Sequence, residues 1–438
     1  MTQQTAPAPT AGTAPAPPAP QGRHASTPTV PRGVALLGPL TMGSTPAALV
    51  RLRALSAAVV LLATALSALL LVLGWTANRA AAADTEQLIR AQSVKTDLLR
   101  ADALATNAFL VGGQESPASR AAYDDALTSV TETIAAAARA QPADQQVLAR
   151  LNADVLDYAS TMELARANNR QGLPVGSAYL RDASGMLRSD LLPLTDALVT
   201  ANSDRAEGAM GGQHPVLLVL VALVPLAVLL VVNQWLAGRF RRGVNVGLAV
   251  AALAVVAATV AAVAVAGTRA SDNTVVRQNS YATVVDGADA RTAGNDAKSD
   301  ESLRLIARGS GQSFEDAWTA AAARVDTSLQ AAGDATAQEA WQRYRERHAE
   351  IVDLDQRGNW DEAVRLATGG RPDSATAAFA EFDSAIATLV SQASGDATAA
   401  LRGGTWQLLG AAVVWVLLGL AAAASAWRGL TVRLREYA

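Results

Sequence analysis

The sequence predicts an all-α membrane protein, with four transmembrane helices and two extracytoplasmic up-down four-helix bundles. Half of the 438 residues are hydrophobic, and a mean hydropathy of +0.18 is typical of a membrane protein. Alanine dominates and strand-forming residues are sparse outside the apolar runs, which favours helices. Four uncharged runs of 22 residues or more are each long enough to cross about 30 Å of hydrocarbon as a helix.

The chain reads as two copies of one unit, each consisting of a membrane helix, a long polar segment and a membrane helix back again. A short loop rich in arginine separates the copies. The predicted segments are, in order, a disordered Pro/Ala-rich cytoplasmic tail over 1–50, a first span over 54–76, a first bundle over 77–213, a second span over 216–237, a cytoplasmic loop over 238–243, a third span over 244–267, a second bundle over 268–404, a fourth span over 405–427 and a cytoplasmic tail over 428–438.

The distribution of charge predicts which side of the membrane each segment faces. The segment 77–213 has a net charge of −5 and the segment 268–404 a net charge of −7, whereas the tails and the central loop together carry +9. Lys and Arg near membrane spans are retained in the cytoplasm. We therefore expect a multi-pass protein of the bacterial plasma membrane, with both termini in the cytoplasm and both long segments outside.

The first span has a competing interpretation as a cleaved signal peptide, because small residues at 80–83 follow it. Its apolar core is longer than the 7–15 residues of a signal peptide, and a long tail precedes it. We therefore interpret it as a retained anchor, with a helix continuing outward to about Val111. The third span carries small residues every four positions, which predicts close approach of another helix; they are Ala254, Ala258, Ala262 and Ala266.

Each long segment contains blocks of apolar residues at alternating steps of three and four, which is the pattern of a helix with one buried stripe. Gly and Pro end helices for backbone reasons, and they separate the blocks. Such breaks fall at Gly112-Gly113, Gln141-Pro142 and Gly172-Leu173-Pro174 in the first segment and at Gly309-Ser310-Gly311 in the second. Gly172 and Gly358 stand at matching points before the fourth helix of each bundle, so four helices are expected in each copy.

No catalytic constellation is present in the sequence. There is no cysteine and only three histidines, His24, His214 and His348, and no phosphate-binding loop follows a strand. We expect no enzymatic activity, no cofactor, no metal and no nucleic-acid partner. His348 lies on a buried stripe, where a neutral hydrogen-bonded imidazole is the expected state and a pH sensor is the alternative. The spans contain no charged residue, which argues against a transport pathway.

Each long segment resembles the four-helix-bundle sensor domain of bacterial chemoreceptors and histidine kinases. The resemblance lies in two stretches at the turn before the fourth helix, NNRQGLPVGSAYL over 168–180 and DQRGNWDEAVR over 355–365. Neither unit is followed by a HAMP segment or a kinase. A tandem unit of this kind is similar to the actinobacterial GlnX-type membrane proteins, over nearly the whole chain after Val50. That resemblance implies a relay between an amino-acid-binding lipoprotein outside and a Ser/Thr kinase inside, and it assigns a role to no residue.

The expected function is that of a non-enzymatic coupler of a nutrient signal across the membrane. A cytoplasmic partner would contact arginines of the loop and the tail, namely Arg239, Arg241, Arg242, Arg428, Arg433 and Arg435. The alternative role of these arginines is to fix topology and to contact membrane lipid. Two other functions remain open, an envelope scaffold and a direct small-molecule sensor with a separate output protein. Arg181 or Arg365 would be candidates for holding a carboxylate ligand, and a homodimer is possible.

Overall fold

A computed structural model describes residues 38–42, 44–111, 115–240 and 243–435, and these residues contain helices and no strand. Four helical segments are long and apolar enough to cross a membrane, so the predicted all-α membrane class is confirmed. The helices are α2 (Gly38–Thr41), α3 (Thr45–Leu110), α4 (Pro117–Ala140), η2 (Pro142–Asp144), α5 (Gln145–Arg170), α6 (Val175–Met186), η3 (Leu187–Leu191), α7 (Leu192–Met210), α8 (Pro215–Phe240), α9 (Val246–Val276), η4 (Arg277–Tyr281), α10 (Ala282–Ile306), α11 (Gln312–Ala332), α12 (Ala335–Gln356), α13 (Trp360–Thr368), α14 (Ala375–Arg402) and α15 (Trp406–Arg435).

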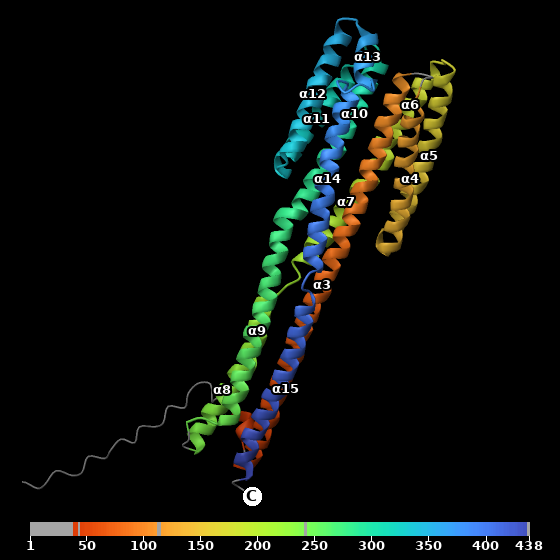
Figure 1. The fold of residues 1–438 in the computed structure, drawn as a ribbon. Helices are drawn as coiled ribbons and strands as arrows, with labels where there is room; N and C mark the ends of the chain where they lie inside the picture. Colours follow the sequence, from red (N-terminus) through yellow and green to blue (C-terminus); the bar gives the residue numbers. More distant parts are fainter. Residues whose placement is uncertain (1–37, 43, 112–114, 241–242, 436–438) are drawn as a thin grey trace, which may run out of the picture.

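Two helical lobes lie side by side at one end of the molecule, and the apolar helices extend from them to the other end (Figure 1). The first lobe consists of the C-terminal half of α3 with α4, α5 and the run α6–η3–α7. The second lobe consists of α10 to α14. The first core is mainly aliphatic, whereas five aromatic rings fill the second; they belong to Trp318, Trp341, Tyr344, Phe379 and Phe382.

The apolar parts of α3, α8, α9 and α15 share one hydrophobic core. Within it, α15 packs against both α3 and α9, and α8 packs against the same two helices. The small-residue stripe of α9 lies in this core, with Ala258, Ala262 and Ala266 buried. Gly247 of α9 approaches Gly429 of α15 so closely that their backbones are in contact. The close approach predicted for the third span is therefore present, and its partner is the fourth.

The first helix is longer than its predicted membrane span at both ends. It runs without a break for 66 residues, from Thr45 to Leu110, a length of about 100 Å. Residues 45–50, which the sequence assigns to the disordered tail, lie in this helix, while residues 1–37 lie outside the described part of the chain. The predicted outward continuation to the first Gly-Gly break is confirmed, and α9, η4 and α10 form a second continuous run of 61 residues.

The two long runs meet through matching residues, and a π-helix sets their register. Asn273 donates a hydrogen bond to the Asn78 side chain at 2.9 Å, and Thr292 meets Thr96 at 3.3 Å. The first pair is separated by 195 residues and the second by 196. The π-helix η4 lies between Asn273 and Thr292, and one π-turn accommodates one extra residue in a helix. It therefore accounts for the one-residue difference.

The turn before the fourth helix has the same geometry in both lobes. Gly172 and Gly358 have φ angles of 68° and 82°, a left-handed conformation that glycine adopts without a Cβ clash. After this turn the lobes differ. In the first lobe the helix continues through the π-helix η3, whereas in the second α13 ends at Thr368 and α14 begins at Ala375. The single fourth helix expected in the second lobe is therefore two helices, because Gly369, Gly370 and Pro372 interrupt it.

The contact between α9 and α15 gives a test of this packing. A Cβ atom at Gly247 would lie 2.5 Å from the Cα atom of Gly429 and 2.5 Å from the carbonyl oxygen of Ser425. Backbone atoms cannot rotate away, so Gly247→Ala is expected to lower the free energy of unfolding by roughly 1–3 kcal/mol. Thermal unfolding of the detergent-solubilised chain measures this loss.

Gly267 is the matched control, because it lies in the same helix and a Cβ atom there would meet open space. Gly267→Ala is expected to be neutral or stabilising by up to about 1 kcal/mol, since alanine favours helices over glycine. Equal unfolding midpoints for the two variants would contradict the close contact of α9 with α15.

Candidate functional site

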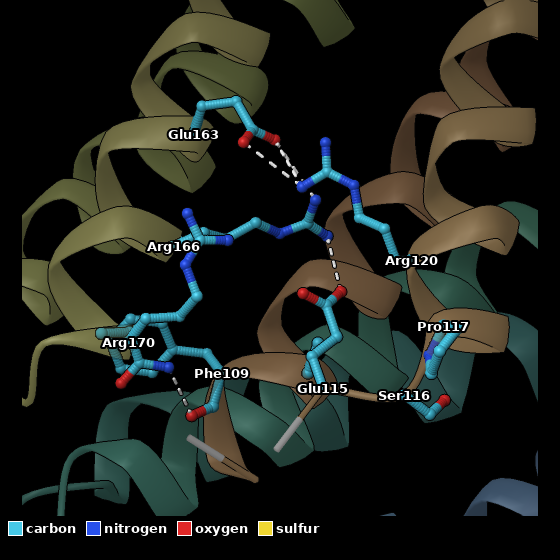
Figure 2. Close-up of a pocket in the computed structure, with 10 residues that line it drawn as sticks. Phe109, Glu115, Ser116, Pro117, Arg120, Glu163, Arg166 and Arg170 are labelled. Carbon is cyan, nitrogen blue, oxygen red and sulfur yellow. Dashed lines mark hydrogen bonds and ion pairs between the residues drawn. The ribbon is translucent and has the colours of Figure 1, made fainter. Parts of the chain in front are cut away.

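The candidate site is a cavity of about 480 Å³ at the membrane-distal end of the first lobe. The end of α3, the beginning of α4 and the end of α5 form its walls (Figure 2). Three arginines and two glutamates line it, together with small and apolar side chains. The lining residues are Ala108, Phe109, Glu115, Ser116, Pro117, Arg120, Glu163, Arg166, Asn169 and Arg170.

Local sequence signals place the three walls. Ser116 caps α4 by accepting a hydrogen bond from the Ser119 amide at 3.1 Å, and Pro117 occupies the first turn, where its missing amide hydrogen costs nothing. On the opposite wall, Asn169 near the end of α5 donates a hydrogen bond to the Phe109 carbonyl of α3 at 3.1 Å. The end of α3 and the end of α5 are thereby tied together beneath the cavity.

Arg166 lies at the centre of the site and is only 5% exposed. Its guanidinium carbon lies 3.8 Å from the centre of the Tyr123 ring, close enough for a cation–π interaction. Nη1 of Arg166 lies 3.4 Å from Glu163, and Nη2 lies 3.3 Å from Oε1 of Glu115 (Figure 2). Arg166 therefore links a glutamate just before α4, Glu115, to a glutamate on its own helix, Glu163.

Arg120 closes the site from α4 and pairs with two carboxylates. Its Nη1 lies 2.9 Å from Glu163, and its Nε donates to Asp124 at 3.0 Å. Burial alone would lower the pKa of Arg120, but the hydrogen bonds to the two carboxylates raise it. Burial also raises the pKa of the Tyr123 hydroxyl beneath Arg166. Both groups therefore keep their protons at neutral pH.

A second polar cluster joins the two lobes. Asp102 of α3 is fully buried and accepts hydrogen bonds from Ser184 of α6 at 2.7 Å and from Ser299 of α10, in the other lobe, at 2.7 Å. The Tyr158 hydroxyl donates to it at 3.3 Å, and Arg188 lies at 3.5 Å. A buried carboxylate is costly unless it is paired and hydrogen-bonded, so Asp102 favours the docked arrangement of the lobes.

Arg188 extends this cluster to two further carboxylates of α10. It lies 2.9 Å from Asp296 and 3.5 Å from Asp300, and Arg324 of α11 lies on the other side of Asp296 at 2.9 Å. Burial raises the pKa of the Asp300 carboxyl to about 7, although Arg188 opposes the shift. The interface between the lobes therefore contains a group that titrates near neutral pH.

His348 is buried in the second lobe between two carboxylates. Nδ1 lies 3.0 Å from Glu301 and Nε2 lies 3.3 Å from Glu315, and the imidazole stacks on Trp318. Burial alone would lower the pKa of His348, but its hydrogen bonds to the two glutamates raise it. Lys298 also pairs with Glu301 at 2.6 Å. Two acidic neighbours that are distant in sequence therefore favour the protonated imidazole over the neutral one expected from the sequence.

The arginines predicted to contact a cytoplasmic partner lie far from this cavity, at the opposite end of the molecule. The side chain of Arg239 reaches the beginning of α3, where its Nη2 donates a hydrogen bond to the Thr45 hydroxyl at 3.1 Å. Arg428, Arg433 and Arg435 lie on the last turns of α15. Arg241 and Arg242 lie outside the described residues. The partner role of these arginines stays a prediction.

The other predicted candidates do not form a site. Arg181 and Arg365 are exposed, and neither lines the distal cavity. Arg166 and Arg120 occupy it instead, and sequence reasoning missed both. The available signal was Arg166 beside Ala165 on the buried face of α5, within reach of Glu163 on the same helix. Within the described residues, no group of His, Cys, Asp or Glu is arranged to hold a metal ion.

The raised pKa of Asp300 predicts a pH-dependent stability. In the unfolded chain the Asp300 carboxyl ionises near pH 3.8, whereas in the fold it keeps its proton to about pH 7. The carboxylate therefore destabilises the fold increasingly from about pH 4 to 7. Asp300→Asn removes this penalty, so its gain in unfolding free energy is expected to grow over that range to the order of 1–4 kcal/mol at pH 8.

Thermal unfolding between pH 5 and pH 8 measures the Asp300 effect. Asp361→Asn, an exposed position on α13, is the control and is expected to change stability by less than about 0.5 kcal/mol at every pH. A constant gain for Asp300→Asn across the pH range would contradict a carboxyl that titrates near neutrality.

Comparison with known proteins identifies the first lobe. Residues 77–211 match the protein family described as actinobacterial sensor domain. The matched segment begins within α3 and ends directly after α7, so it contains the distal cavity and Asp102. No curated protein and no solved structure matches the chain. The match and the four candidate membrane spans support a sensor-type actinobacterial protein that crosses a membrane several times.

Proposed function

We propose that this chain is a transmembrane signal coupler, with the two lobes outside the cell and both termini in the cytoplasm. The observation that carries the proposal is the continuity of α3, which runs unbroken from the arginine-rich end of the molecule to the wall of the distal cavity. A stiff helix of this length transmits a displacement at one end to the other. The sensor-domain match over the first lobe supports the signal-sensing part of the proposal.

Coupling requires that both lobes respond together, and the inter-lobe contacts supply the connection. Asp102 and Arg188 of the first lobe bind Ser299, Asp296 and Asp300 of α10. The helix α10 continues through η4 into α9, and α9 packs on α15. A ligand or partner that binds one arrangement of the lobes more tightly than another would shift the population of arrangements in the spans, by no more than its difference in affinity.

The finer form of the proposal names the partners. Outside, a nutrient-binding lipoprotein, with an amino acid as its cargo, would dock on the first lobe, where large apolar side chains are exposed on α5 and the turn after it. These are Leu156 and Leu164 of α5, Leu173 of the turn and Val175 at the start of α6, and exposed apolar side chains suit a contact with another protein. Inside, a Ser/Thr kinase would read the arginine-rich end, whose cations also suit anionic lipid headgroups.

The absence of cysteine from the sequence makes the orientation directly testable. Val50→Cys and Val432→Cys place single thiols on exposed positions at the arginine-rich end, and Leu164→Cys places one on the first lobe. With a membrane-impermeant maleimide on intact cells, we expect labelling at position 164 only. After permeabilisation all three are expected to react. Labelling of position 432 in intact cells would overturn the proposed orientation and the cytoplasmic output with it.

The coupling itself is tested by a distance measured far from the lobes. Spin labels at Val50→Cys and Val432→Cys report the separation of α3 and α15 at their arginine-rich ends. Ser299→Ala removes the hydrogen bond to Asp102 across the lobe interface and is expected to shift or broaden this distance distribution by roughly 1–2 Å.

Ser302→Ala is the matched control for coupling, because Ser302 is buried on the same helix and donates to the Lys298 carbonyl of its own lobe. It is expected to leave the distribution unchanged. Indistinguishable distributions for the two variants would contradict transmission from the lobes to the spans.

A further inference from the structure

We propose that the distal cavity of the first lobe binds a small amino carboxylate directly, with the ligand carboxylate on one edge of the Arg166 guanidinium and the ligand ammonium on Glu115. This goes beyond the coupler proposal, in which a separate binding protein recognises the nutrient. It concerns binding alone, so it stands or falls independently of transmission across the membrane.

The unsatisfied edge of the Arg166 guanidinium is the first reason. Nε and Nη2 of this residue make no hydrogen bond to any described residue, although both atoms are buried. These two nitrogens form one side of the planar guanidinium, and their parallel N–H groups match the two oxygens of a carboxylate. Buried donors are almost always satisfied in folded proteins. Because Arg166 lines the cavity, its unsatisfied pair of donors indicates a site for an acceptor.

Glu115 supplies the complementary half of the site. Its Oε1 lies 3.3 Å from Nη2 of Arg166, yet neither atom makes a hydrogen bond. The two charges are neighbours without being well paired. A ligand that carries both a carboxylate and an ammonium group would satisfy both at once, since the carboxylate accepts from Arg166 and the ammonium donates to Glu115.

Neighbouring groups explain why Arg166 rather than Arg120 would hold the carboxylate. Arg120 already donates through Nε to Asp124 and pairs through Nη1 with Glu163. The stacking of Arg166 on Tyr123 fixes the plane of its guanidinium, so little entropy is lost when a ligand binds. The amino end of α4, at Ser116 and Pro117, also borders the cavity and favours a negative group.

The size of the cavity fits a small metabolite. Its volume of about 480 Å³ lies within the range of about 300–1,000 Å³ that is typical of small-molecule sites. Figure 2 shows Arg166 extending across the cavity, with Glu163 on one side and Glu115 on the other. A small α-amino acid would therefore contact the end of α3, the beginning of α4 and the end of α5 together.

The test uses the full chain in lipid nanodiscs and calorimetric titration with three probes, L-alanine, L-glutamine and L-glutamate. Each probe is paired with its counterpart lacking the amino group, which is propionate, glutaramate or glutarate, and with its decarboxylated counterpart. We expect saturable binding of at least one amino acid and binding at least about tenfold weaker for both of its counterparts. Absence of heat from all three amino acids up to about 10 mM would overturn the proposal.

Three variants locate the site. Arg166→Lys keeps the charge but removes the bidentate edge, and it is expected to weaken amino-acid binding at least about tenfold. Arg150→Lys, on the exposed face of the same helix, is expected to bind as the unaltered chain does. Glu115→Gln is expected to reduce the preference for the amino acid over its counterpart lacking the amino group, while that counterpart binds as before.

Each remaining outcome decides the proposal. Unchanged binding in both Arg166→Lys and Glu115→Gln would place the ligand elsewhere and overturn it. Equal losses in Arg166→Lys and Arg150→Lys would show a general effect of the substitution and would also overturn it. Binding that disappears only in the two cavity variants, whether or not the spin-label distances change, supports the site even if coupling fails.

Discussion

The arrangement of the whole molecule depends on the buried carboxylate of Asp102. A charge removed from water costs several kcal/mol unless partners surround it, and Asp102 obtains its partners from both lobes. Ser184 and Tyr158 belong to its own lobe, whereas Ser299 belongs to the other. Separation of the lobes would expose or strand this charge. Asp102 therefore connects the first lobe to α10, which continues through η4 into α9 and the apolar region.

The membrane imposes the second constraint, because a chain that crosses hydrocarbon must satisfy its backbone hydrogen bonds internally. Helices meet this requirement, and the same hydrogen bonding continues past the apolar region into the lobes. The matched pairs Asn78–Asn273 and Thr96–Thr292 would fall out of register by one residue without the π-helix η4 between them. The π-helix η4 therefore preserves the pairing of the two long helical runs. This pairing is a reason for a π-helix within a run that is otherwise α-helical.

The sequence predicts the parts of this structure that depend on local or periodic signals. Uncharged runs, stripes of apolar residues and the glycines at 172 and 358 carry enough information to place spans, buried faces and turns. The π-helices depend on how two lengths of chain match across the fold, which no single segment shows. The break after Thr368 has a local signal in Gly369, Gly370 and Pro372, which the sequence analysis did not use. The cavity and the raised pKa of His348 depend on neighbours distant in sequence, such as Glu115 for Arg166 and Glu301 for the imidazole. Sites whose charged residues are far apart in the sequence can be identified only from the three-dimensional structure.

The two lobes differ at one pair of corresponding places, which in the first lobe borders the distal cavity. Phe109 and Leu305 are separated by 196 residues, the same spacing as Thr96 and Thr292, and their carbonyls are both capped by a side chain. In the first lobe the donor is the small amide of Asn169, which leaves room beside it. In the second the donor is the indole of Trp360, with the guanidinium of Arg308 4.0 Å above its ring. The two lobes therefore cap corresponding carbonyls with side chains of different size, and only the smaller one, Asn169, is among the residues that line the distal cavity.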